Sequence, residues 1–307
     1  MKEDSIKVLY IAGPTRSGST LLSKILGEVE GFFNAGEIID IWDRGLASDG
    51  LCSCGKPMSQ CDTWKITIDR SFPSKSNKDI QKMINIRDKL AHSTYILPLI
   101  ILSPERFGTC LNHAEYINKL EKLYQGIKSA TGAKVIIDSS KNVGYAFMLA
   151  MAPKIDLYIL HTIRDARATS YSWLRKKEGL WQTNPFESSL VWNLRNISAE
   201  IMVKKMNQKT LRVYYEKFVE EPQKIIKNIL NFVSEEPDNL PFIDKYEILL
   251  NASHSIYGNP NRFQTGKVEI KIDDKWKRDM KYSHKLLVTL LTWPLLARYG
   301  YLIPSKS

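Results

Sequence analysis

Histidine and cysteine are scarce in this sequence, with five and four residues respectively in a chain of 307. The histidines are scattered, and no group of aspartate and histidine residues has the spacing of metal ligands. We therefore expect no metal ion at the reaction site. Repeats, low-complexity tracts and linkers are also missing, so the sequence predicts a single domain over residues 1–307.

Long apolar runs are absent as well. Residues 1–7 are polar, and the apolar run after them is too short for a secretory signal peptide. The longest apolar stretch, Leu286–Ile303, is interrupted by a proline, an arginine and a glycine, so it falls short of the ~20 residues that span a membrane. We predict a cytoplasmic protein without an integral membrane segment, in which this stretch forms a packed C-terminal helix. Contact with a membrane surface is the alternative.

The charge is unbalanced, with 44 basic and 33 acidic residues and a net charge of +11. A polyanionic ligand, nucleic acid or an anionic membrane fits this excess, and so does a well-solvated basic surface. A nucleic-acid partner is not expected, because the sequence contains neither a recognition motif nor a basic run. Hydrophobic residues make up 43% of the chain, which is ample for the core of a globular α/β protein.

What the sequence does contain is a phosphate-binding pattern close to its start. Residues 8–11 (VLYI) are typical of a parallel strand buried on both faces, and Gly13-Pro14 ends the run. Residues 17–20 (SGST) then open a segment whose apolar residues recur at helical spacing. Because the N–H groups of this loop converge at the N-terminus of a helix, we expect an anion-binding site there.

The loop lacks one residue of the nucleoside-triphosphate pattern GxxxxGK[ST], because Ser19 occupies the lysine position. Kinases and ATPases place that lysine on the β- and γ-phosphates, whereas the cation of this loop is Arg16, three residues earlier. The loop therefore favours a single terminal phosphate group over a triphosphate. A P-loop NTPase or kinase-like phosphotransferase is the alternative interpretation.

Four later segments combine a predicted strand with polar residues that follow it. The strands are expected at 32–33, 133–138, 156–163 and 211–215, and the polar residues are Glu37, Ser139 to Lys141, Arg164 and Glu216. In open α/β sheets the ligand crevice lies outside the carboxyl ends of the strands. We therefore expect Glu37 to face the same crevice as the phosphate loop; a helix-terminal charge that faces water is the alternative.

A cysteine-containing segment follows the second predicted strand. Cys52, Cys54 and Cys61 lie within ten residues of one another, whereas Cys110 is distant. Zinc needs four ligands, and three thiols with unequal spacing fit no standard finger pattern. We expect a compact loop on the substrate side; a metal site or a disulfide is the alternative. Together with helices expected at 77–97 and 112–130, this loop forms a predicted helical insertion over about 45–130 that lines the acceptor site.

Three segments together resemble the sulfotransferases that use 3′-phosphoadenosine-5′-phosphosulfate, PAPS. The loop PTRSGSTLL resembles the family's 5′-phosphosulfate loop, TIRDARATSYS its 3′-phosphate segment, and VYYEKFVEEP its motif beside the adenine. With the sequence AGE at 35–37, the combination is most similar to tyrosylprotein-type and bacterial small-molecule sulfotransferases. The resemblance implies a P-loop-like three-layer α/β fold, with a central mostly parallel sheet flanked by helices.

The resemblance also implies roles for individual residues. The nucleotide-binding residues would be Arg16, Ser17, Gly18, Ser19 and Thr20 at the 5′-phosphate, Arg164, Ser172 and Arg262 at the 3′-phosphate, and Tyr215 near the adenine. Glu37 matches the general base of the tyrosylprotein-type enzymes, and His254 is the alternative base. Arg16 and Lys141 would supply positive charge during an in-line transfer of the sulfuryl group to an acceptor hydroxyl, with 3′,5′-adenosine bisphosphate as the product.

Two features depart from the family pattern. A catalytic lysine or histidine usually follows the third strand directly, whereas Lys141 comes only after two serines. The C-terminal Arg-Lys-Gly and Gly-Asp-Trp-Lys signatures of cytosolic sulfotransferases are absent, and Arg262 and Trp276 match them only loosely. The acceptor is expected to be the hydroxyl of a small molecule, a carbohydrate or a lipid. The sequence does not determine the oligomeric state.

Overall fold

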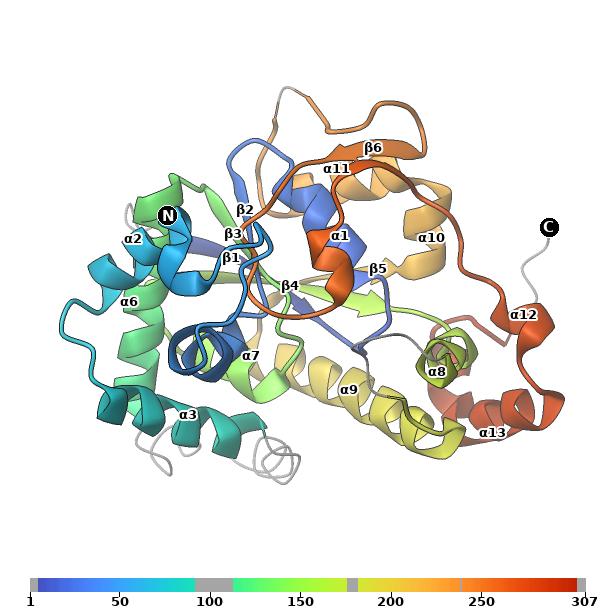
Figure 1. The fold of residues 1–307 in the computed structure, drawn as a ribbon. Coiled ribbons are helices and arrows are strands. Elements are labelled where there is room, and N and C mark those ends of the chain that lie inside the picture. Colours follow the sequence, from blue (N-terminus) through green and yellow to red (C-terminus); the bar gives the residue numbers. More distant parts are fainter. Residues whose placement is uncertain (1–4, 92–112, 176–181, 238, 303–307) are drawn as a thin grey trace.

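The computed structural model describes residues 5–91, 113–175, 182–237 and 239–302 of the chain. Five strands form the central sheet, in the order β2-β3-β1-β4-β5, and every neighbouring pair is parallel. They are β1 (Ile6–Ala12), β2 (Phe32–Gly36), β3 (Val135–Asp138), β4 (Ile155–Ile163) and β5 (Lys209–Tyr214). The predicted α/β fold with a mostly parallel sheet is confirmed (Figure 1).

The central strand β1 explains why the core has two halves. Successive side chains of a strand point to opposite faces of the sheet. Val8 and Tyr10 therefore pack into one hydrophobic cluster, while Leu9 and Ile11 pack into the other. All four are fully buried, which is why this segment shows no polar alternation in the sequence.

Helices cover both faces of the sheet and make the fold three-layered (Figure 1). One face is covered by α1 (Ser19–Gly27), α10 (Tyr215–Glu220) and α11 (Pro222–Phe232). The other is covered by α6 (His113–Thr131), α7 (Val143–Ala150) and α9 (Pro185–Met206). The predicted helices at 112–130, at 185–206 and from Pro222 are thus confirmed within one residue.

Between β2 and β3 the chain forms the region that the sequence assigned to an insertion at about 45–130. Besides α6, its described elements are η1 (Ile38–Asp40), η2 (Ile41–Ala47), η3 (Met58–Gln60), α2 (Asp62–Ser71) and α3 (Asn77–Ala91). The predicted helix at 77–97 is described as far as α3 extends, and its last six residues lie outside the described residues. That the whole chain is one domain, with this region on the acceptor side, stays a prediction.

The C-terminal part adds a hairpin and a third hydrophobic cluster. The hairpin consists of β6 (Glu247–Leu250) and β7 (Gly266–Glu269), with η5 (Pro260–Phe263) in its connection. The cluster joins α8 (Ala166–Leu174), α9, α12 (Trp276–Asp279) and α13 (Tyr282–Arg298).

The predicted packed C-terminal helix corresponds to α13. Val288, Thr292, Leu295 and Leu296 are its buried residues. The helix continues through Pro294, although proline lacks the N–H that would form an intrahelical bond. No helix in the described ranges has both the length and the apolar character needed to cross a membrane.

Candidate active site

The predicted site segments lie at one edge of the sheet. Because all five strands run in the same direction, their carboxyl ends share an edge, and ligands of open α/β sheets bind outside that edge. The segments that follow the five strands there are the phosphate loop 13–18, Glu37, Ser139 to Lys141, Arg164 and Tyr215. Sequence positions that are up to two hundred residues apart therefore belong to the same edge.

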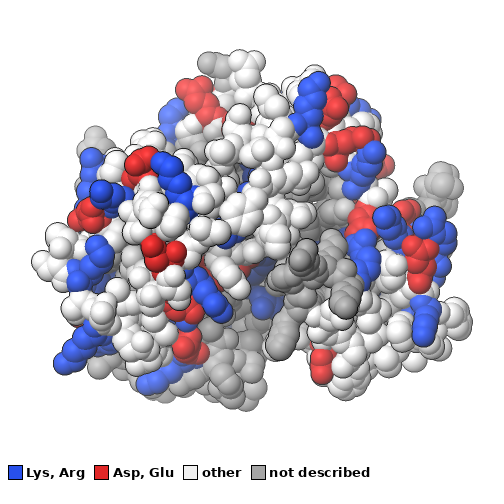
Figure 2. Space-filling model, viewed as in Figure 1, with Lys and Arg blue, Asp and Glu red and all other residues white. Residues whose placement is uncertain are grey.

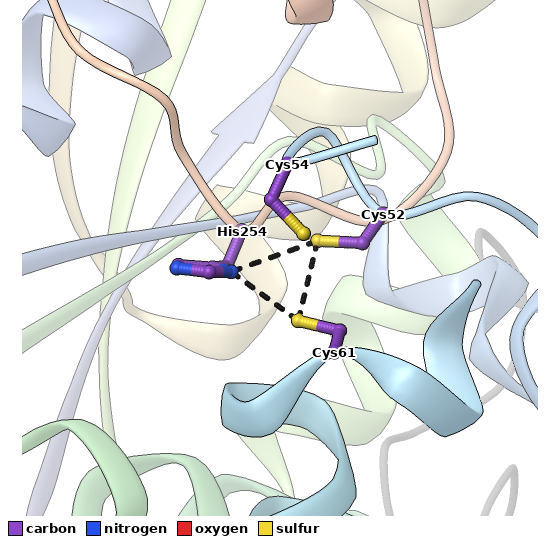
Figure 3. A group of neighbouring side chains, drawn as sticks. All are labelled: Cys52, Cys54, Cys61 and His254. Atoms are coloured by element: carbon purple, nitrogen blue, oxygen red, sulfur yellow. Dashed lines mark hydrogen bonds between the residues drawn. The ribbon is translucent and has the colours of Figure 1, made fainter. Parts of the chain in front are cut away.

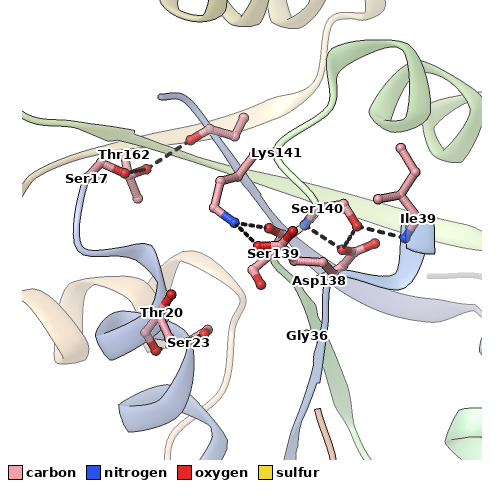
Figure 4. A network of polar contacts seen from close by, with 12 residues as sticks. Ser17, Thr20, Ser23, Gly36, Ile39, Asp138, Ser139, Ser140, Lys141 and Thr162 are labelled. Atoms are coloured by element: carbon pink, nitrogen blue, oxygen red, sulfur yellow. Dashed lines mark hydrogen bonds and ion pairs between the residues drawn. The ribbon is translucent and has the colours of Figure 1, made fainter. Parts of the chain in front are cut away.

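The phosphate loop packs tightly against β4 and the start of α10. Gly13 has φ 115°, and a Cβ atom there would lie 2.2 Å from the carbonyl oxygen of Thr162. Gly18 has φ 82°, and a Cβ atom there would lie 2.6 Å from the ring of Tyr215. The hydroxyls of Ser17 and Thr162 share a 2.8 Å hydrogen bond (Figure 4). Both glycines are thus required by the backbone conformation and by the lack of space.

Helix α1 begins at Ser19, directly after this loop. Its N-terminus has no side-chain cap and no acidic residue in the first turn. The first N–H groups of a helix have no partner within the helix, and they attract anions. The start of α1 therefore matches the anion site that the sequence predicts.

Arg16, Arg164 and Arg175 bring three guanidinium groups to this end of the sheet. Each lies over an aromatic ring: Arg16 is 4.7 Å from the ring centre of Trp173, and Arg164 is 4.2 Å from that of Tyr215. The Nε atoms of all three arginines are buried and have no hydrogen-bond partner among the described residues. Buried donors without partners are costly, about 1–3 kcal/mol each, so this cluster offers donors to an anionic ligand.

Asp273 is the counter-charge of this arginine cluster. Its carboxylate accepts a hydrogen bond from Nη2 of Arg175 and forms an ion pair with Arg164, at 3.3 Å between Nη2 and Oδ2. Burial acts to raise the pKa of Asp273, but the hydrogen bond from Arg175 and the charge of Arg164 hold it below its ordinary value. Burial, together with the charge of Arg175, lowers the pKa of Arg16. One ionised carboxylate thus faces two arginines.

Tyr215 connects the loop with this cluster. Its ring touches Gly18 on one side and Arg164 on the other, and its hydroxyl accepts a hydrogen bond from the backbone N–H of Asp273 at 3.2 Å. A pocket of about 510 Å³, lined by Tyr215, Asp273 and Trp276 among others, opens beside it. The sequence placed Tyr215 at the end of a strand, whereas it begins α10 directly after β5.

Lys141 and Glu37 form an ion pair at the ends of β3 and β2. The distance between Nζ and Oε1 is 2.8 Å, and the side chains are 6% and 23% exposed respectively. The ammonium group also donates to the carbonyl oxygen of Ser139 at 2.5 Å (Figure 4). Lys141 has φ 60°, so the chain turns sharply after the strand and directs the side chain back to Glu37. The two extra serines therefore do not separate Lys141 from the other site residues.

Asp138 holds the turn that carries Lys141. Its carboxylate is fully buried and accepts a hydrogen bond from the hydroxyl of Tyr124 at 2.5 Å. It also accepts one from the N–H of Ser140 at 2.8 Å (Figure 4). Burial raises its pKa to about 6, against the opposing effect of these hydrogen bonds. The hydroxyl of Ser140 in turn accepts from the N–H of Ile39, which links β3 to the segment after Glu37.

No hydrogen bond or ion pair joins Ser172 or Arg262 to Arg164 among the described residues. Ser172 is buried within α8. Arg262 lies in η5 and donates to the carbonyl oxygen of Ser255 at 3.2 Å, and Lys24 donates to its carbonyl oxygen at 3.0 Å. Burial lowers the pKa of Arg262. Its partner Ser255 directly precedes Ile256, which bonds to the backbone of Ala35 and Glu37, so Arg262 lies nearer to the Glu37 side of the edge. Their roles at a 3′-phosphate stay predictions.

Sequence reasoning missed three residues of this edge. Arg175 lies eleven residues after Arg164, and its position in the same segment was the available signal. Asp138 is the last residue of a buried strand, where a carboxylate is unusual, and this signal was not used. Asp273 lies in the tail of the chain and gave no local signal.

The model of the sulfotransferase family matches residues 9–238, which is most of the chain. The chain belongs to the sulfotransferase family. The resemblance stated from the three sequence segments is thus confirmed, and enzymes of this kind transfer sulfuryl groups. The match includes Arg16, Glu37, Lys141, Arg164 and Tyr215, and ends before His254 and Arg262.

Solved structures are similar to the chain over nearly its whole length. The sulfotransferase domain from the curacin biosynthetic pathway is 15% identical, covers 96% of this chain and 98% of its own, and superposes with a TM-score of 0.51. The sulfotransferase domain of the Synechococcus PCC 7002 olefin synthase is 18% identical, covers 96% of both chains and has a TM-score of 0.49. At 15% identity, the similarity to the curacin-pathway domain shows a shared fold and nothing more specific. A comparison with curated protein sequences finds no match.

Proposed function

We propose that the chain transfers the sulfuryl group from PAPS to a hydroxyl of an acceptor and releases 3′,5′-adenosine bisphosphate. The observation that carries this proposal is the set of buried, unpartnered Nε donors of Arg16, Arg164 and Arg175 beside the phosphate loop. These donors fit a nucleotide with anionic groups at both its 5′ and 3′ ends. The family match over residues 9–238 supports the reaction type.

The 5′ end of the nucleotide is assigned to the loop and the start of α1. The N–H groups of residues 17–20 and the guanidinium of Arg16 would hold the phosphosulfate there, and Ser19 in the lysine position favours it over a triphosphate. The 3′-phosphate is assigned to Arg164, with Ser172 and Arg262 as further expected ligands. Its proximity to Arg164 and the loop supports Tyr215 as the residue beside the adenine.

The residues at the two ends of the edge have different roles in the proposed transfer reaction. When bound, PAPS supplies an activated sulfuryl group, whose bond to the bridging phosphate oxygen breaks as the bond to the acceptor oxygen forms. Arg16 and the loop N–H groups stabilise the charge that develops on the bridging oxygen. Glu37 removes the proton of the acceptor hydroxyl, and Lys141 holds Glu37 in place through their ion pair.

The acceptor side is assigned to the elements between β2 and β3, which flank Glu37. A hydroxyl of a small molecule, a carbohydrate or a lipid is the proposed acceptor. A nucleic-acid partner is not proposed, because basic and acidic side chains are intermingled on the face in Figure 2 and form no continuous basic patch among its described residues. The predicted cytoplasmic location is also retained as a proposal.

The melting temperature of the protein, measured with different nucleotides, tests the identity of the sulfuryl donor. We expect 3′,5′-adenosine bisphosphate to raise the melting temperature much more than 5′-AMP or ATP at equal concentration. Equal or larger stabilisation by ATP with Mg²⁺ would instead favour the phosphotransferase alternative. A screen of hydroxyl compounds with labelled PAPS, read out as labelled product, then identifies the acceptor class.

A further inference from the structure

Four side chains with metal-binding atoms lie close together, next to the segment that bonds to the backbone of Glu37. Cys52, Cys54 and Cys61 come from the loop before α2, and His254 comes from the segment after β6 (Figure 3). Their three Sγ atoms and one imidazole nitrogen all lie within 4.8 Å of one another. His254 follows Cys61 by 193 residues, so only the folded chain reveals the fourth member.

Three distances within this cluster are close to those expected around a tetrahedral ion. The Cys61 and Cys52 sulfurs are 3.6 Å apart, and Nδ1 of His254 lies 3.2 Å from the first and 3.8 Å from the second. Zn–S bonds of about 2.3 Å and Zn–N bonds of about 2.0 Å, at tetrahedral angles, place two sulfurs about 3.8 Å apart and sulfur and nitrogen about 3.5 Å apart. A disulfide would instead bring two sulfurs to about 2.05 Å, and all three cysteines are free.

We propose that Cys52, Cys54, Cys61 and His254 bind a structural zinc ion. Three thiolates with one imidazole are a common ligand set of structural zinc sites, and soft sulfur ligands disfavour magnesium and calcium. The histidine fills the fourth position, so no position is left for a reactive water. Cys52 and Cys61 are completely buried, which shields the ion from solvent.

The backbone around the sulfurs supports this assignment. The N–H of Cys52 donates to the carbonyl oxygen of Lys56 at 2.9 Å, and the N–H of Gly55 donates to the carbonyl oxygen of Cys52 at 2.9 Å, so a tight turn holds Cys52 and Cys54. Cys61 directly precedes α2, whose N-terminus favours the negative charge that thiolates carry as metal ligands.

His254 is also held from outside the cluster. The indole N–H of Trp64 donates to its backbone carbonyl at 2.6 Å. Its neighbours Ser253 and Ser255 bond to Ser53: the hydroxyls of Ser53 and Ser253 are 2.9 Å apart, and the N–H of Ser255 donates to the Ser53 hydroxyl at 2.8 Å. The cysteine loop and the C-terminal segment are thus already aligned at the point where the ion would join them.

The zinc would fix the segment that supports Glu37. Two residues after His254, Ile256 donates to the carbonyl oxygen of Ala35 at 2.9 Å and accepts from the N–H of Glu37 at 3.1 Å. Gly258 lies against the Glu37 side chain, since a Cβ atom there would be 3.0 Å from Oε1. The existence of the site is independent of the proposed function; its effect on the position of Glu37 rests on that function.

The metal content of the purified full-length chain tests the proposal. The protein is purified with reductant and without chelator, and zinc is measured by inductively coupled plasma mass spectrometry. We expect one zinc per chain in the wild type. Cys61→Ser and His254→Ala should lose most of it, whereas His284→Ala, which removes a histidine of α13, should retain it. Because no nucleotide or acceptor is present, the result does not depend on the sulfotransferase proposal.

Cobalt substitution provides a readout if a ligand variant fails to fold. Wild-type protein reconstituted with Co²⁺ should show the visible and near-ultraviolet bands of tetrahedral cobalt thiolates. The thiolate-to-cobalt band should weaken in Cys54→Ser, which removes the partly exposed cysteine, and visible absorption should recover in Cys54→His. Wild-type protein that retains no zinc after dialysis and gives no cobalt–thiolate band overturns the proposal, whether its thiols are free or joined in a disulfide.

Discussion

The two ends of the carboxyl edge differ in how their cations are satisfied. At the β2–β3 end, the ammonium of Lys141 has two partners, the Glu37 carboxylate at 2.8 Å and the carbonyl oxygen of Ser139 at 2.5 Å. Towards the β4–β5 end, Arg16, Arg164 and Arg175 each keep a buried Nε atom without a partner among the described residues. A satisfied ion pair is suited to hold a group in position, whereas unpartnered donors are suited to bind an anion from solution.

This difference suggests that the two ends have separate tasks. Arg164 and Arg175 would contribute mainly to the affinity for the nucleotide and Glu37 to the rate of transfer, whereas Arg16 would contribute to both. Substitutions at the two ends should therefore change different kinetic parameters. The predictions that follow test this separation.

The largest effect is expected at Glu37. Glu37→Gln keeps an acceptor for Lys141 but removes the basic group, so the rate should fall roughly 10²–10⁴-fold while bisphosphate affinity is retained. The measurement is kcat with PAPS together with calorimetric titration of 3′,5′-adenosine bisphosphate. Glu30→Gln, at an exposed turn, is the matched control. An unchanged rate would show that Glu37 has only a structural role.

Arg16 should show the next largest effect. Arg16→Ala removes a charge-assisted contact of ~1.5–3 kcal/mol, so kcat/KM for PAPS should fall about 10- to 150-fold. Arg16→Lys keeps the positive charge but removes the planar guanidinium group, so its comparison with Arg16→Ala distinguishes the effect of the charge from that of the guanidinium geometry. Kinetics within a factor of two of wild type, at an unchanged melting temperature, would contradict the assignment of the loop.

Arg164 should control selectivity for the 3′-phosphate. Because Arg175 remains nearby in Arg164→Ala, we expect the lower end of the range, ~1.5 kcal/mol or about tenfold weaker binding of 3′,5′-adenosine bisphosphate. Affinity for 5′-AMP should not change. Titration of both nucleotides distinguishes this outcome from an equal loss for both, which would place the 3′-phosphate elsewhere.

The smallest effect is expected at Asp273, and it has the opposite sign. Asp273→Asn removes the carboxylate that competes for Arg164 and Arg175, so bisphosphate should bind about 2- to 5-fold more tightly, the equivalent of ~0.5–1 kcal/mol. Weaker binding in a variant that still folds would show that Asp273 positions the arginines for the ligand rather than competing with it.

Asp273 also predicts a dependence of stability on pH. Its pKa is lowered in the folded chain, so its contribution is present above the ordinary pKa of a carboxyl group and is lost as the pH falls through the lowered value. Chemical denaturation of the wild type between neutral and strongly acidic pH should therefore show a loss at the acid end that is smaller in Asp273→Asn. Parallel curves for the two proteins would contradict this.

Much of the fold follows from local sequence patterns. The apolar runs at 8–11 and 156–163 predict buried strands because a strand covered on both faces cannot alternate with polar residues. Their carboxyl ends predict site residues because parallel strands share that edge, and Arg16, Glu37 and Arg164 were found in this way. The boundaries were less accurate, as Tyr215 shows, since a strand and the helix after it can share one continuous hydrophobic pattern.

The position of Lys141 shows where local patterns stop being sufficient. Two additional serines suggested that this lysine is displaced from the catalytic position of the family. In the structure, the positive φ of Lys141 and the bonds of Ser140 to Asp138 bend the chain back so that the ammonium meets Glu37. A single backbone angle decided this contact, and no residue type in the segment, such as glycine, indicated it.

By itself, the sequence determined the α/β class and the sulfotransferase resemblance, and it predicted a phosphate loop and candidate site residues directly after strands. Only the tertiary structure showed that Asp273 faces the arginines and that His254 completes the group of three cysteines. The physical reason is the same in both cases: a carboxylate and an imidazole acquire these partners from segments about 100 and 200 residues away. Local periodicity carries no information on such contacts, because they form only when the C-terminal segments pack against the edge of the sheet.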